Sequence, residues 1–264
     1  MHVKTDTTAI AEPLLDVTRK PRRRDWFFVG ISIAATVAVF LGFARTYYLK
    51  SFFPIPRFPL LFHVHGALFT AWMLLLVLQV YLAASRRIAL HRQFGVIGQF
   101  LVVPMLATGF LAAIAAARGQ APISAAVKRG ELPMIVGSNG LSPLEALVVP
   151  LTTLLVFGIF AGAGLICRTR PEVHKRFMML ATIAILPAAI GRAISTLFGM
   201  AKPAVFFGAP GLFVLAMLMY DCRQRGRVHP VTLWGGLVLM LSFPIRLSLG
   251  KTDLWLTFAA WLIR

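Results

Sequence analysis

The chain has 264 residues, of which 58% are hydrophobic and only 14% are charged, and its formal net charge is +18. A soluble domain is about half apolar and about a quarter charged, and nine acidic residues cannot cover a water-facing surface of this size. The composition therefore excludes a soluble enzyme and indicates a membrane protein. The two cysteines, Cys167 and Cys222, predict neither a disulfide framework nor a cysteine zinc site. The sequence also lacks the C-x-x-C-H signal of covalently attached haem.

Apolar runs of about 18 or more residues predict membrane-crossing helices, because a hydrocarbon core about 30 Å thick needs about 20 helical residues. We therefore expect an all-α polytopic bundle of seven transmembrane helices in a membrane domain over 26–251. The polar, basic segment 1–25 predicts a disordered cytoplasmic arm, and the aromatic segment 252–264 predicts a tail at the membrane interface. The seven apolar runs are 26–43, 60–84, 95–117, 143–167, 177–198, 203–220 and 231–248.

The distribution of Lys and Arg predicts the orientation, because cytoplasmic connections are enriched in them. Of the 27 such residues, 16 lie in the N-terminal segment and in the connections after the second, fourth and sixth runs, and nine lie on the opposite side. We therefore expect the N-terminus in the cytoplasm and the C-terminus outside. Because the basic residues occupy short connections, contact with the anionic lipids of the bilayer explains the charge better than nucleic-acid binding.

Ionisable residues in or beside the spans are the candidates for function, because they are costly in lipid. At the outer face, Arg192 and Arg246 each lie a turn or two inside an otherwise apolar run. With their neighbours they predict a pocket for an anion, a quinone or another small solute. The alternative is an interhelical salt bridge with snorkelling arginines and interfacial histidines. The residues of this predicted outer pocket are His63, His65, Arg45, Glu145, Arg192 and Arg246.

The second run has a polar stripe. His65, Trp72 and Gln79 follow at seven-residue steps and so lie on one helical face. Gln79 needs a hydrogen-bond partner at mid-membrane depth, so we expect this stripe to face the bundle interior. His63 and His65 diverge by about 200° on a regular helix, which prevents them from sharing one metal ion.

At the inner face the sequence contains an internal echo. Arg87-Ile-Ala-Leu-His91 and Arg170-Pro-Glu-Val-His174 align at a constant offset of 83, as do Pro104 and Pro187. Two histidines at one depth on parallel helices are suited to approach a haem iron from opposite sides. His91 and His174 are therefore the predicted ligands of one haem b. The alternative is that each belongs to a basic helix-start cluster among lipid head groups.

Several motifs resemble those of an uncharacterised family of bacterial multi-helix inner-membrane proteins. They are His63-Val-His65-Gly66 followed by Phe69-Thr-Ala-Trp72, then Leu90-His91-Arg92-Gln-Phe-Gly95, and His174-Lys-Arg-Phe-Met-Met-Leu-Ala-Thr182. The resemblance implies a multi-pass protein of the bacterial inner membrane and implies no activity.

The histidines at helix ends are also distantly similar to the cytochrome b561 type of membrane haem protein, in which paired histidines on four central helices hold two haems. His91 and His174 match one such pair. His63 or His65 has no histidine partner on the fourth run, where Glu145 stands instead, so the resemblance implies one haem at most.

Two hypotheses follow from the sequence. The leading one is a membrane protein that binds a small ligand or partner in the outer pocket, and the alternative is a haem- or quinone-linked electron-transfer protein. No paired general acid and base stands out at either face, which favours a protein that is not an enzyme.

Overall fold

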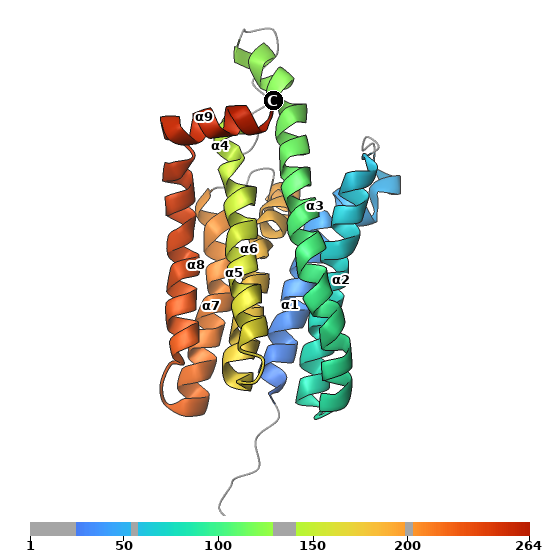
Figure 1. Cartoon of the computed structure of the whole chain (residues 1–264), viewed down its shortest axis with the longest axis vertical. Coiled ribbons are helices and arrows are strands. Elements are labelled where there is room, and N and C mark those ends of the chain that lie inside the picture. Colours follow the sequence, from blue (N-terminus) through green and yellow to red (C-terminus); the bar gives the residue numbers. More distant parts are fainter. Residues whose placement is uncertain (1–24, 54–57, 129–140, 199–202) are drawn as a thin grey trace, which may run out of the picture.

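The computed structural model describes residues 25–53, 58–128, 141–198 and 203–264, and within them every regular element is a helix (Figure 1). Residues 1–24 of the predicted arm lie outside the described residues. A π-helical turn, Ala44–Tyr48, extends the first helix, and a short 3-10 turn, Lys50–Phe52, follows it. The α-helices are α1 (Trp26–Phe43), α2 (Leu60–Ala84), α3 (Ile88–Lys128), α4 (Pro143–Ala146), α5 (Val148–Ile166), α6 (Pro171–Phe198), α7 (Pro203–Arg225), α8 (Pro230–Leu249) and α9 (Asp253–Leu262).

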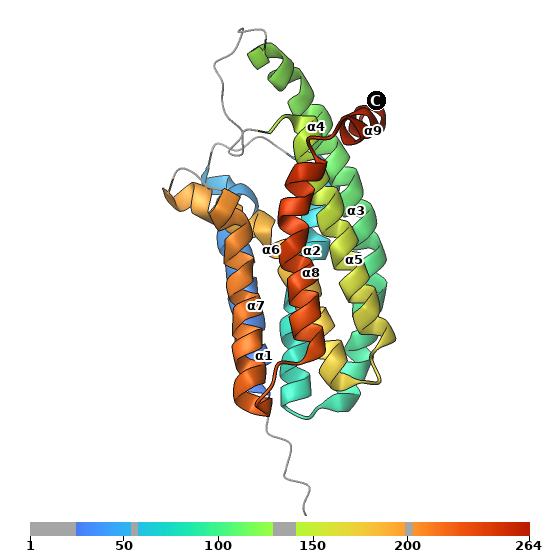
Figure 2. The same cartoon turned by 90° about the vertical axis from the view of Figure 1, so that its left-hand side faces the viewer.

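Six segments are long and apolar enough to cross a membrane, which confirms a multi-pass membrane protein. They contain α1, α2, α3, α4 with α5, α6 and α8. The seventh expected crossing corresponds to α7, which runs alongside the other helices in Figure 2 but falls outside this set. Seven crossings and the predicted orientation therefore stay predictions.

Two helices begin earlier than their apolar runs. Helix α3 starts at Ile88 rather than residue 95, and α6 starts at Pro171 rather than residue 177. Pro171 suits a helix start, since its fixed φ is helical and the first turn needs no amide donor. Both histidines of the internal echo consequently lie inside helices, within their first turns.

The fourth apolar run is divided between two helices. Ser142 and Glu145 form a reciprocal capping box that starts the four-residue helix α4, and Leu147 separates it from α5. Pro150 has no amide hydrogen to donate to the carbonyl of Ala146, and its ring crowds that carbonyl. The break follows from this missing hydrogen bond.

Helix α6 is the centre of the bundle. It packs against α1, α5, α7 and α8. In an apolar stretch of 18 residues within it, 67% of the residues are buried, against 28–33% in the corresponding stretches of the other five candidate spans. Small residues permit the close approach, as expected for helices in lipid. A Cβ on Gly42 would lie 2.1 Å from the Ala189 carbonyl oxygen, so α1 and α6 meet almost backbone to backbone.

The bundle has a basic end and an opposite end. The basic end is where α1 begins and where the α2–α3, α5–α6 and α7–α8 connections lie, and it is the predicted cytoplasmic end. Helix α9 lies across the opposite end (Figure 1). Trp255 anchors it there, donating from Nε1 to the Leu144 carbonyl oxygen at 2.8 Å, and its apolar face packs on α3, α4 and α5.

Candidate functional site

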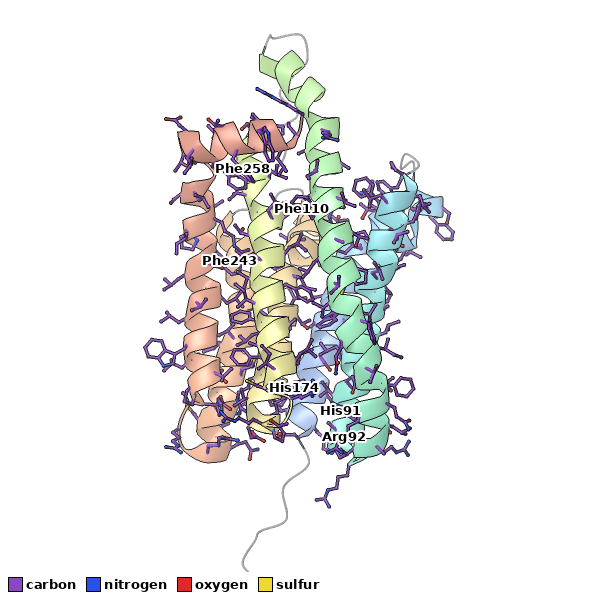
Figure 3. The ribbon with its side chains drawn as sticks, in the orientation of Figure 1. His91, Arg92, Phe110, His174, Phe243 and Phe258 are labelled. Atoms are coloured by element: carbon purple, nitrogen blue, oxygen red, sulfur yellow. The ribbon has the colours of Figure 1, made fainter. Side chains whose placement is uncertain are left out.

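The two histidines of the internal echo lie close together near the basic end (Figure 3). The ring centres of His91 on α3 and His174 on α6 are 6.4 Å apart, and the ring planes differ by 86°. Helices α3 and α6 run in the same direction, and the two histidines are separated in sequence by the 83 residues of the echo. The fold therefore brings the predicted inner pair into direct proximity.

Both rings are oriented by a backbone carbonyl of the preceding helix. His91 Nδ1 lies 3.1 Å from the Gln79 carbonyl oxygen on α2, and His174 Nδ1 lies 2.7 Å from the Gly164 carbonyl oxygen on α5. A carbonyl oxygen only accepts, so Nδ1 is the donor in each ring. In the neutral ring Nε2 then keeps its lone pair, which is the arrangement of histidines that bind metal through Nε2.

The Nε2 atoms are left for another partner. Within the described ranges, neither His91 Nε2 nor His174 Nε2 makes a hydrogen bond. These ranges also contain no group of three or more His, Cys, Asp or Glu side chains placed to hold a metal ion. Two imidazoles do not complete a tetrahedral or octahedral protein site. They do match a metal that brings its own remaining ligands.

An unpaired amide lies beside this pair. Both polar atoms of the Gln79 side chain are buried and have no partner among the described residues. The amide points at α3 one turn after His91, because a Cβ on Gly95 would lie 3.7 Å from Gln79 Nε2. A buried amide without partners costs about 1–3 kcal/mol. The expected polar stripe thus faces inward, as Trp72 also does by donating to Thr182 Oγ1 at 3.1 Å.

The residues of the predicted outer pocket lie in several separate sets of contacts. His63 accepts at Nε2 from Lys50 Nζ at 3.3 Å, and its backbone carbonyl accepts from Tyr47. Arg45 lies over the Phe53 ring at 5.1 Å. His65 packs on Phe69, and its Nδ1 is buried with no partner in the part of the chain that is described.

The other three predicted residues are positioned by other helices. Glu145 caps α4 through the Ser142 amide at 2.6 Å. Arg192 lies on α6, with its guanidinium 5.2 Å from the centre of the Phe43 ring. Arg246 on α8 is 2% exposed and donates to Thr153 and Ser242 hydroxyls at 2.8 and 2.9 Å.

The sequence did not indicate a buried charge network at the basic end. Arg176 is fully buried and pairs with Asp221, which is 1% exposed, and with Glu172. Thr232 donates to the same Asp221 carboxylate at 2.6 Å. The network connects α6, α7 and α8, and Arg225 extends it through Glu172. The one available signal was Asp221, a rare acid directly after an apolar run.

Comparison with known protein families, with characterised proteins and with solved structures finds no match. The fold defines the class of the molecule, a helical multi-pass membrane protein, and its function has to be argued from the side chains.

Proposed function

We propose that the protein is a b-type haem protein of the membrane that transfers electrons, in which His91 and His174 would hold the iron of one haem. The observation that supports it most is the adjacent pair of imidazoles, each with an Nδ1–H···O=C hydrogen bond that makes Nε2 the lone-pair atom of the neutral ring. Metal-binding histidines ordinarily donate their other ring N–H to a carbonyl or carboxylate oxygen in this way.

The spacing of the two rings agrees with a shared metal ion. With metal–imidazole bonds of about 2.0–2.1 Å and about 1.1 Å from nitrogen to ring centre, two rings that donate to one ion lie at most about 6.3 Å apart. The ring centres of His91 and His174 are 6.4 Å apart. A porphyrin supplies four equatorial nitrogens, so a haem iron needs only the two donors that this pair offers.

The surroundings of the pair also fit a bound group. The Gln79 amide is buried and lacks a partner among the described residues, and Gly95 leaves space at the same level of α3. When bound, haem would supply one-electron exchange at the iron. The chain would hold both Nε2 lone pairs in place through the Gln79 and Gly164 carbonyls.

The test is haem content. The full chain, expressed with sufficient haem and purified in detergent, is expected to contain close to one non-covalent haem per chain. His91→Ala and His174→Ala are each expected to lose most of it, whereas His229→Ala, which changes another histidine of the basic end, retains it. Undiminished haem in a His91→Ala, His174→Ala double variant would overturn the proposal.

A second candidate function is ligand binding at the predicted outer face. It is favoured by the buried Nδ1 of His65, which has no partner among the described residues, and by the pairing of Lys50 with His63. Its ligand is a small solute or a quinone. Quenching of tryptophan fluorescence by a short-chain ubiquinone tests it. We expect His65→Ala to weaken the quenching and His229→Ala to leave it unchanged, and equal quenching in both variants would contradict it.

The same proposal includes the setting of the protein. We infer seven crossings, with α7 as the seventh, in a bacterial inner membrane with a cytoplasmic N-terminus. The excess of Lys and Arg at the basic end supports this orientation. Alkaline phosphatase fused after Arg264 reports the side of the C-terminus. It is active only if the C-terminus lies outside the cytoplasm.

A further inference from the structure

Two arginines of this membrane protein are almost completely buried, and their surroundings differ. Arg176 is 0% exposed and pairs with the carboxylates of Asp221 and Glu172. Arg246 is 2% exposed and has only hydroxyl partners, Thr153 and Ser242, among the described residues. Within one protein, one buried guanidinium thus has a countercharge in the fold, and the other has none among the described residues.

Most of the unused hydrogen-bonding groups around Arg246 are donors. Its Nε is buried and has no partner in the described ranges. Nη1 and Nη2 each have two hydrogens and each makes one bond to protein. The Ser242 hydroxyl donates to the Leu239 carbonyl oxygen at 2.6 Å, whereas the Thr153 hydroxyl accepts from Arg246 and makes no described donation. A ligand here must therefore accept hydrogen bonds.

The charge lies inside the bundle rather than in water. Arg246 is about one turn before the end of α8, about 4.5 Å along the axis from Leu249. Helix α9 lies across this end of the bundle (Figures 1 and 2). The face of Phe243, 5.0 Å from the guanidinium carbon, offsets part of the charge. An ionised group in such a position is ordinarily paired with another charge.

We propose that Arg246 and Thr153, positioned by Ser242, form a binding site for an oxyanion, that is, a phosphate or carboxylate group. A guanidinium presents parallel N–H groups that match two oxygens of such an anion, and the Thr153 hydroxyl adds a donor from α5. The anion belongs either to a free solute or to the head group of an outer-leaflet lipid. This site rests on the second candidate function, ligand binding at the outer face, and locates it at Arg246 instead of at Lys50 and His63. The site does not depend on the haem proposal.

The experiment compares thermal unfolding of the full chain in two series. In detergent, inorganic phosphate is titrated at constant ionic strength; in nanodiscs, phosphatidylcholine alone is compared with phosphatidylcholine containing phosphatidylglycerol. We expect a higher Tm with phosphate if the source is a free anion, or with phosphatidylglycerol only if the source is a lipid. Arg246→Gln should abolish this shift and Thr153→Val should reduce it.

The matched control is Arg118→Gln, the same change at an exposed arginine that lies beside Ile263 at this end of the bundle, and it should keep the full shift. An unchanged Tm in both series, or an equal shift in Arg246→Gln, would overturn the inference. If Arg246→Gln does not fold, Thr153→Val decides, since its full response to both probes would equally contradict the site. If the Tm shift is lost in His63→Ala but kept in Arg246→Gln, the ligand binds at the outer face near His63, and the Arg246 site is rejected.

Discussion

Replacing Asp221 by asparagine should destabilise the bundle more than any other single change of an acidic residue. The Arg176 guanidinium has no exposed surface, and it donates from Nε to the Asp221 carboxylate at 3.3 Å besides the direct ion pair. Asparagine keeps the acceptor for Thr232 but removes the charge. Breaking a buried pair by removing one partner costs about 3–5 kcal/mol, because the remaining charge is uncompensated.

The retained carboxylate moderates this effect. Glu172 lies 2.9 Å from Arg176 Nη1 and is partly exposed, so it still screens part of the charge after the change. We therefore expect about 3 kcal/mol, the lower end of the range. The measurement is the free energy of unfolding in mixed micelles under increasing denaturing detergent.

The control and a double variant separate charge from packing. Asp253→Asn removes an exposed acid in the first turn of α9 and should cost less than about 1 kcal/mol. Arg176→Met combined with Asp221→Leu should recover much of the stability, because no unpaired charge remains. The reasoning is refuted if Asp221→Asn is no less stable than Asp253→Asn.

Two further predictions concern the α1–α6 contact and the start of α8. Gly42→Ala should destabilise by about 1–3 kcal/mol, because its Cβ would meet the Ala189 carbonyl, whereas Gly30→Ala, with nothing within 4 Å, should be neutral or slightly stabilising; equal unfolding transitions in detergent would contradict the close approach. Burial, with the nearby Arg176 and Arg225 charges, lowers the pKa of His229 below its ordinary 6.5, and its Nδ1 accepts from the Val231 amide. The unfolded chain therefore takes up this proton first, so stability should fall as the pH drops below 6.5 and level off below the folded pKa. His229→Asn, which can still cap α8, should make the pH profile of Tm flatter, and an unchanged profile would show that another group is responsible.

The apolar runs predicted the positions of the helices well where lipid-facing residues extend to the helix ends. Helix α2 has the expected bounds of 60–84. The starts of α3 and α6 were placed too late, because polar and charged residues occur within their first two turns and hydropathy marks only the apolar part of a helix. The break at Leu147 arises from Pro150, a local signal inside an apolar run.

The candidate site was predicted in part. The offset of 83 selected His91 and His174, but the carbonyls that orient them come from neighbouring helices and therefore depend on packing. From the sequence, Arg176 counts only as one of the basic residues in the connection after the fourth run, which predict the orientation. Its burial results from the convergence of α6, α7 and α8, which the sequence signals only through Asp221, an acid directly after an apolar run.

The most direct test of the haem proposal is a visible absorption spectrum of the detergent-purified full chain before and after dithionite. The neighbouring rings of His91 and His174, each with Nδ1 bonded to a carbonyl, predict a sharp low-spin b-type band on reduction, which is lost in the His91→Ala, His174→Ala double variant. A featureless spectrum from protein expressed with sufficient haem, with metal analysis also blank, would contradict the proposal and leave the outer ligand as the function to pursue.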